Sequence, residues 1–272
     1  MKRTKWILTA FVMVLIFFGC SKKDGNDVWL ADLSNPFIGQ WQSEIPSMGN
    51  AKAVFEFKTD GTFTCVFPDL PLEYGGGVIY TGGYLVKDNV QVTFLSGDGG
   101  MGGYTFAVIA NDALSVTEID EVNEATGEYN HGNTAMFTRV QGSPINMENK
   151  PFALSNVLIG GTWKETTTPY QAEYFYQANG TGTMSYTGGG TSAIAYSVFH
   201  DEGIGKDVLI MYMTATKTFA SYAFEQTREA DTILVQEITG VTMGAEGPFA
   251  SYGPAVIFTK NYGVNQGGKN GY

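Results

Sequence analysis

The chain has 272 residues, of which 43% are hydrophobic, 14% are aromatic and only 16% are charged. A chain this apolar can bury enough surface to fold, which excludes an intrinsically disordered protein, and its 35 glycines exclude a long coiled coil. The formal net charge of -11 argues against nucleic acid as a partner, because such a partner requires a basic face.

The first segment of the chain has the pattern of an export signal. Three basic residues among the first five positions precede an uncharged run over 7–18, which is too short to cross a bilayer as a helix. The Gly19-Cys20 pair that follows resembles the lipobox of bacterial lipoproteins. This resemblance implies a signal peptide over 1–19 and lipidation of Cys20. An ordinary signal peptide with an incidental cysteine is the alternative.

The polar residues that follow Cys20 predict a tether over 20–35. Acyl chains on one cysteine anchor a protein to a membrane, so the lipobox resemblance implies an exported protein held by its lipid in the bacterial cell envelope. Ser21 beside the cysteine resembles the sorting pattern for the outer membrane. The second cysteine, Cys65, shares a predicted strand face with two phenylalanines, which indicates a buried thiol and no disulfide.

The rest of the chain contains two copies of a similar sequence. Phe37-Ile38-Gly39-Gln40-Trp41 matches Leu158-Ile159-Gly160-Gly161-Thr162-Trp163, and the residues over 57–62 match those over 176–181. The offset stays near 120, which indicates an internal duplication. We therefore predict one domain over 36–140, a linker over 141–157, a second domain over 158–260 and a flexible tail over 261–272.

Each copy contains short alternating runs separated by Asn, Asp and Gly turn signals, which predict about eight antiparallel strands. The first copy has them near 37–44, 52–58, 62–68, 77–86, 89–95, 103–110, 113–120 and 134–140. The second has them near 158–167, 171–177, 182–187, 193–200, 207–215, 219–227, 231–238 and 253–260. The prediction is all-β: two consecutive eight-stranded up-and-down barrels, with two β-sandwiches as the alternative.

A Gly-x-Trp motif in the first strand and a basic residue in the last resemble the lipocalin-like (calycin) family. The residues concerned are Trp41 with Arg139 in the first copy and Trp163 with Lys260 in the second. The resemblance implies that each tryptophan packs across the closed end of its barrel beneath the basic side chain, where a cation gains about 0.5–2 kcal/mol. It also implies that any ligand enters at the opposite, open end, although the aromatic side chains could instead fill the interior.

Both copies carry a long segment before the last strand, over 120–133 and 240–252. The first is acidic and the second is apolar and small. Segments of this length inside a compact domain are often functional, so a role in partner binding and a role as plain solvated loops both stay open.

No pattern in the chain predicts catalysis. The glycine-rich run over 97–102 is followed by a predicted strand and not by the helix that a dinucleotide site requires. His131 lies in a predicted loop, His200 stands beside two acids at a turn, and the acidic residues over 118–128 lack EF-hand spacing. We therefore expect no enzyme, no metal site and no cofactor.

These patterns predict non-catalytic binding of a small hydrophobic or amphipathic ligand by a membrane-anchored lipoprotein, although they name no ligand-binding residue. The alternative is an interaction module of the envelope or cell surface, with filled barrels that bind protein or glycan through their loops. An interior cavity larger than about 300 Å³ would favour ligand binding.

Overall fold

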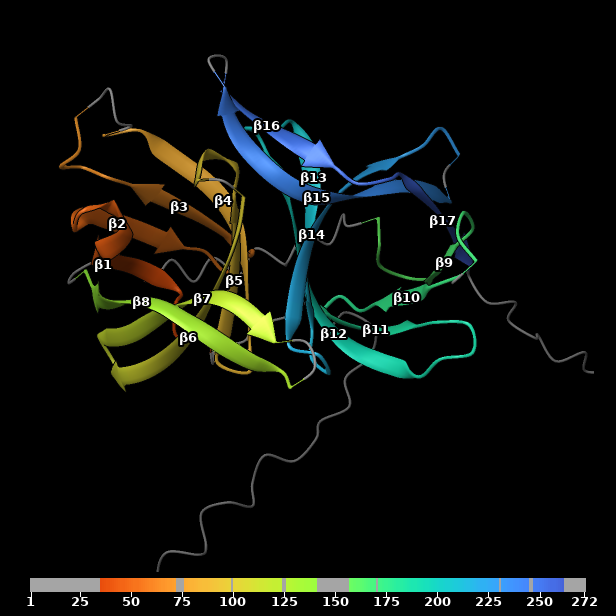
Figure 1. The fold of residues 1–272 in the computed structure, drawn as a ribbon. Helices are drawn as coiled ribbons and strands as arrows, with labels where there is room; N and C mark the ends of the chain where they lie inside the picture. Colours follow the sequence, from red (N-terminus) through yellow and green to blue (C-terminus); the bar gives the residue numbers. More distant parts are fainter. Residues whose placement is uncertain are drawn as a thin grey trace, which may run out of the picture.

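The computed structural model describes residues 35–71, 76–98, 100–123, 126–140, 157–169, 171–229, 231–244 and 247–261. The predicted signal peptide with Cys20, most of the tether, the linker and the tail lie outside these residues. The described chain forms two β-barrels that lie side by side (Figure 1).

The first barrel is a closed meander in which each strand pairs with its neighbour in sequence. Its strands are β1 (Gly39–Ile45), β2 (Ala51–Phe57), β3 (Thr62–Val66), β4 (Ile79–Lys87), β5 (Val90–Leu95), β6 (Gly100–Ala110), β7 (Ala113–Asn123) and β8 (Glu128–Arg139). Antiparallel pairing of Trp41 with Arg139 joins β1 to β8 and closes the sheet. Closure leaves no unpaired edge.

The second barrel repeats this plan. Its strands are β9 (Thr162–Glu165), β10 (Glu173–Tyr176), β11 (Thr181–Ser185), β12 (Thr191–Asp201), β13 (Lys206–Met213), β14 (Thr218–Gln226), β15 (Thr232–Gly244) and β17 (Val256–Asn261), with β16 (Gly247–Tyr252) added to the far half of β15. Pairing of β14 with β15, β15 with β17 and β17 with β9 closes it. The prediction of two consecutive eight-stranded barrels is confirmed, and the sandwich alternative is wrong.

The same local chemistry builds the matching turns of the two copies. Asp60 Oδ1 accepts hydrogen bonds from the backbone nitrogen of Thr62 at 3.0 Å and from its hydroxyl at 2.6 Å. Asn179 makes the same two bonds to Thr181, at the same two distances. The glycine between each pair has a positive φ, +80° or +74°, which glycine adopts without steric cost.

The expectation of two long loops before the last strands is wrong. The segment 120–133 consists mostly of the paired ends of β7 and β8, and 240–252 contains the paired end of β15 together with β16. Both hairpins run beyond the barrel wall, where their side chains are largely exposed, so they lack the apolar alternation by which a half-buried strand is recognised.

Helical structure in the described chain consists of short 3-10 turns, η1 (Pro46–Met48) and η3 (Ser96–Asp98). Among the described residues, no helix has the length and apolar character needed to cross a membrane.

The two barrels pack against each other through a shared apolar core. In Figure 1, β4 and β5 of the first barrel face β12 and β13 of the second, and β6 contacts β14. The buried members of this core are Leu85, Val90, Val92, Phe94 and Ile119 from the first barrel, and Ala195, Phe199, Val208, Ile210, Tyr212, Ala223 and Ile238 from the second. Phe199 lies directly over Gly83, where a Cβ atom would overlap its ring.

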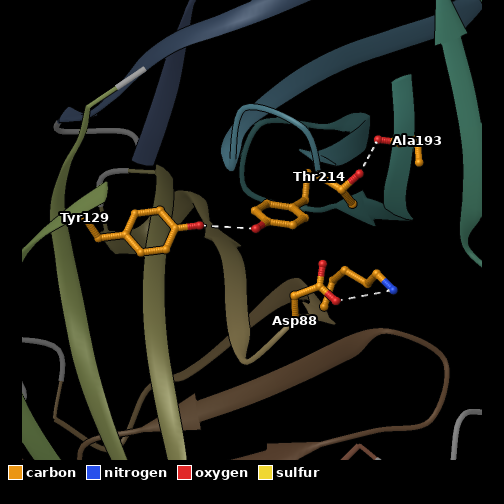
Figure 2. A network of polar contacts seen from close by, with 6 residues as sticks. Asp88, Tyr129, Ala193 and Thr214 are labelled. Atoms are coloured by element: carbon orange, nitrogen blue, oxygen red, sulfur yellow. Dashed lines mark hydrogen bonds and ion pairs between the residues drawn. The ribbon is translucent and has the colours of Figure 1, made fainter. Parts of the chain in front are cut away.

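The extended hairpins add to this interface from both sides. Figure 2 shows the Tyr129 side chain of β8 directed toward the second barrel, where its hydroxyl lies 3.2 Å from that of Tyr212 and donates to the Lys217 carbonyl oxygen at 3.1 Å. From the other side, Val241 of β15 reaches Gly100 of the first barrel. Each copy therefore extends one hairpin onto the other.

Candidate functional site

One end of each barrel is closed by a tryptophan. Trp41 is fully buried, and the Arg139 guanidinium carbon lies 4.3 Å from its ring centroid. Arg139 also donates hydrogen bonds to the carbonyl oxygens of Ile38 at 2.9 Å and Pro36 at 3.2 Å. The cation thus ties the chain entering the barrel to the last strand.

Trp163 and Lys260 occupy the matching positions of the second barrel. The Lys260 ammonium nitrogen lies 5.3 Å from the indole centroid and donates to the carbonyl oxygens of Ile159 at 2.7 Å and Val157 at 3.1 Å. The indole nitrogen donates to the Leu158 carbonyl oxygen at 2.8 Å. These contacts belong to the closed end, so a ligand site has to be sought further along each barrel.

The first barrel holds a cavity of about 330 Å³. Phenylalanines dominate its wall, and the ring centroids of Phe57 and Phe63 lie 5.5 Å apart. Its buried polar group is Gln91, whose side-chain nitrogen has no hydrogen-bond partner among the described residues. Glu118 and Asn133 also line this cavity, so its interior combines the phenylalanines with several polar groups.

The second barrel holds a larger cavity, of about 410 Å³, whose lining is mostly apolar. Buried Trp163 and Tyr176 lie at its base, whereas Tyr186, Glu237 and Pro254, all exposed, lie at its mouth. Between them the wall is formed by Leu158, Ala172, Tyr174, Leu209, Met211, Tyr222, Phe224, Ile233, Val235, Val256 and Phe258. A cavity with apolar walls and few polar groups is the usual form of a small-molecule site.

Glu165 is the distinctive residue of this cavity. It follows Trp163 by two positions on β9, so both side chains point into the barrel. Glu165 is only 6% exposed. Its Oε2 accepts a weak hydrogen bond from the Ala172 backbone nitrogen at 3.4 Å, and its Oε1 has no hydrogen-bond partner among the described residues. A buried carboxylate oxygen without a partner is costly and marks a position where a ligand could supply one.

Three tyrosines stand around the same space. The rings of Tyr174 and Tyr176 are stacked at 6.0 Å between centroids, and Tyr222 lines the same cavity. Burial raises the pKa of Tyr174 and Tyr176 well above the usual value, and burial together with Glu237 raises the pKa of Tyr222 to about 12. All three are therefore neutral near pH 7 and can donate hydrogen bonds into the cavity.

A third hollow, of about 730 Å³, lies between the barrels. Its lining mixes apolar side chains, such as Ile38, Phe106 and Val108, with polar ones, such as Asn35 and Asn179, and with the surface ion pair of Lys87 and Asp88. Figure 2 shows Asp88 beside the interface. This groove lies between the walls of the two barrels and not in the interior of either one.

The two histidines considered in the sequence lie away from these cavities. His131 is on the exposed part of β8, and His200 is on the outer surface of β12, where its Nδ1 lies 2.8 Å from Asp207 Oδ1. In the described part of the chain, no group of three or more His, Cys, Asp or Glu side chains is placed to hold a metal ion. Cys65 is buried, as expected, and lines the cavity of the first barrel.

No ligand-binding residue was predicted from the sequence, although a charged residue at a core-facing position could have indicated one. On a strand whose inward face begins with Trp163, the next inward position carries a charged residue, Glu165. A charged residue at a core-facing position is uncommon and indicates either a buried ion pair or a site. The other wall residues could be identified only once the barrel was closed.

No protein-family model matches this chain, and no curated protein matches it.

Proposed function

We propose that this protein is a non-catalytic carrier or receptor for a small hydrophobic or amphipathic molecule, built from two tandem lipocalin-like domains. The observation that carries the proposal is the 410 Å³ cavity of the second barrel, closed at the Trp163 end and bordered by exposed residues at the other. Burial of apolar ligand surface in such a space contributes about 25 cal/mol per Å².

The test is saturable binding of an uncharged hydrophobic dye, followed by fluorescence on the purified full-length mature chain. In Val235→Trp an indole would occupy the cavity, because Val235 lines it. Leu234→Trp is the matched control, because the neighbouring position on a strand points to the outer face. We expect Val235→Trp to abolish binding and Leu234→Trp to preserve it. Absence of saturable binding to the wild-type protein would refute the proposal.

The proposal places the protein at the bacterial cell envelope, anchored through a lipid on Cys20, with the outer membrane as the expected location. The lipobox resemblance of Gly19-Cys20 supports it. Cys20→Ser should move the protein from the membrane fraction to the soluble fraction of expressing cells and abolish incorporation of labelled fatty acid. Retention of the label in that variant would refute lipidation at this cysteine.

A second candidate function is an interaction module that binds an envelope or surface protein or a glycan. It is favoured by β16, which exposes Phe249 (54%) and Tyr252 (36%) on the hairpin beyond the barrel wall. Replacement of both side chains by alanine would abolish capture of such a partner and leave dye binding unchanged. The reverse pattern would favour the cavity.

A further inference from the structure

The charged side chains that line the second cavity are all acidic. Among its described lining residues, Glu165 lies deep and Glu237 lies at the mouth, and none is Lys, Arg or His. Lys164, the basic residue next to Glu165 in the sequence, points outward, and its Nζ lies 3.3 Å from Oε1 of Glu173. A ligand in this cavity therefore meets carboxylates and no protein cation.

The deep carboxylate is incompletely satisfied by the protein. Glu165 Oε1 has no hydrogen-bond partner among the described residues, and the single bond to Oε2 is long, at 3.4 Å. Carboxylates accept bonds at several positions, and a bond from an ionised donor contributes about twice as much as a neutral one. The missing partner that suits this oxygen best is a positively charged donor.

The aromatic walls favour the same kind of group. Tyr174, Tyr176 and Tyr222 line the cavity with Glu165, and the faces of aromatic rings attract cations. Leu209 and Met211 supply apolar surface on the wall formed by β13. The combination suits an ammonium group attached to an apolar body.

The first barrel shows that closure of the fold does not require this carboxylate. Pairing of Trp41 with Phe55 in one copy and of Trp163 with Tyr174 in the other aligns the strands, which places Ser43 where the second barrel has Glu165. Both positions are buried, and both barrels close. The carboxylate is thus a property of the second cavity and not of the scaffold.

We propose that the second barrel binds an amphipathic cation, with its ammonium group on Glu165 Oε1 and its apolar body among the tyrosines and the β13 side chains. This inference rests on the proposed ligand-binding function and adds the charge of the ligand.

The test uses three probes with the same alkyl chain and different heads: octylamine, octanol and octanoate, titrated calorimetrically into the full-length mature chain near neutral pH. A charge-assisted hydrogen bond predicts that octylamine binds at least about tenfold more tightly than octanol. Octanoate should bind most weakly. Glu165→Gln should reduce octylamine to the affinity of octanol while octanol binding changes little.

Glu173→Gln is the matched control, because it removes the same charge from the outer face of the barrel. It should leave the preference for the amine intact. A measurement on the unsubstituted protein gives a second arm: the Ala172 amide, which donates to Glu165, should shift in NMR spectra with octylamine and not with octanol.

The outcomes separate the two proposals. Equal binding of the three probes, or equal loss in Glu165→Gln and Glu173→Gln, would refute the charge assignment and leave ligand binding in place. Absence of binding by all three probes would refute both.

Discussion

The contact between Gly83 and Phe199 makes the packing of the two barrels testable. A methyl group at position 83 would overlap the Phe199 ring, whereas the backbone of Gly83 does not lie in the positive-φ region that disfavours alanine. Gly83→Ala therefore adds volume to a filled interface without backbone strain. Overpacking of this kind costs about 1–3 kcal/mol. Alanine also lowers the conformational entropy of the unfolded chain, which offsets about 0.4–1 kcal/mol of this cost.

Phe199→Ala should be more severe, because the ring is 6% exposed and belongs to the shared core. Removal of a buried phenyl group costs about 3–5 kcal/mol. In the double variant the added methyl meets no ring, so the cost of Gly83→Ala disappears. The double variant should be about 1–3 kcal/mol more stable than the sum of the single changes predicts.

The assay is urea unfolding followed by fluorescence and circular dichroism, with free energies of unfolding taken for all four members of the cycle. Phe249→Ala serves as the control, because this phenylalanine is 54% exposed and its loss should change stability by no more than about 0.5 kcal/mol. Additive effects of Gly83→Ala and Phe199→Ala would refute direct packing of the ring on the glycine.

Three further predictions concern the closed end and the titrating groups. Arg139→Ala should lower the free energy of unfolding by about 1–3 kcal/mol in a urea titration, since it removes the cation over Trp41 and its carbonyl bonds. Asp207 raises the pKa of His200, so the pair stabilises the fold below the unfolded pKa of about 6.5 and the contribution is lost as pH rises through the folded value. An NMR titration should show a lower pKa of His200 in Asp207→Asn. Burial raises the pKa of Tyr222 to about 12, so stability should fall between about pH 10 and 12, and Tyr222→Phe should reduce that fall in urea titrations at alkaline pH.

The fold could be predicted because its determinants are local. Alternating side chains and Asx-Gly turns are short-range signals. Because the Gly-x-Trp motif occurs in both copies, the same order of strands could be predicted in each of them. The hairpin ends of β7, β8 and β15 were missed because they leave the barrel and contact the other barrel through only a few side chains, such as Tyr129 and Val241.

The alternation of apolar and polar residues could not predict the interface between the barrels. In β5, apolar Val90, Val92 and Phe94 alternate with polar Gln91 and Thr93, which would normally place the polar residues outside. The structure reverses this expectation, because the apolar set packs on the second barrel and Gln91 and Thr93 line the first cavity. Alternation specifies two faces of a strand, and only the partner decides which of them is the interior.

The two copies differ where a ligand would lie and agree where the barrel closes. In each barrel a tryptophan beneath a basic side chain closes one end, and the basic side chain bonds carbonyl groups of the chain that enters the barrel. In the cavities, Gln91 of the first copy aligns with Leu209 of the second through the pairings of β4 with β5 and β12 with β13, whereas Ser43 aligns with Glu165. The buried polar side chain is thus an amide on β5 in the first cavity and a carboxylate on β9 in the second. Closure does not constrain these positions, so their divergence after duplication is the change expected if the two cavities came to prefer different molecules.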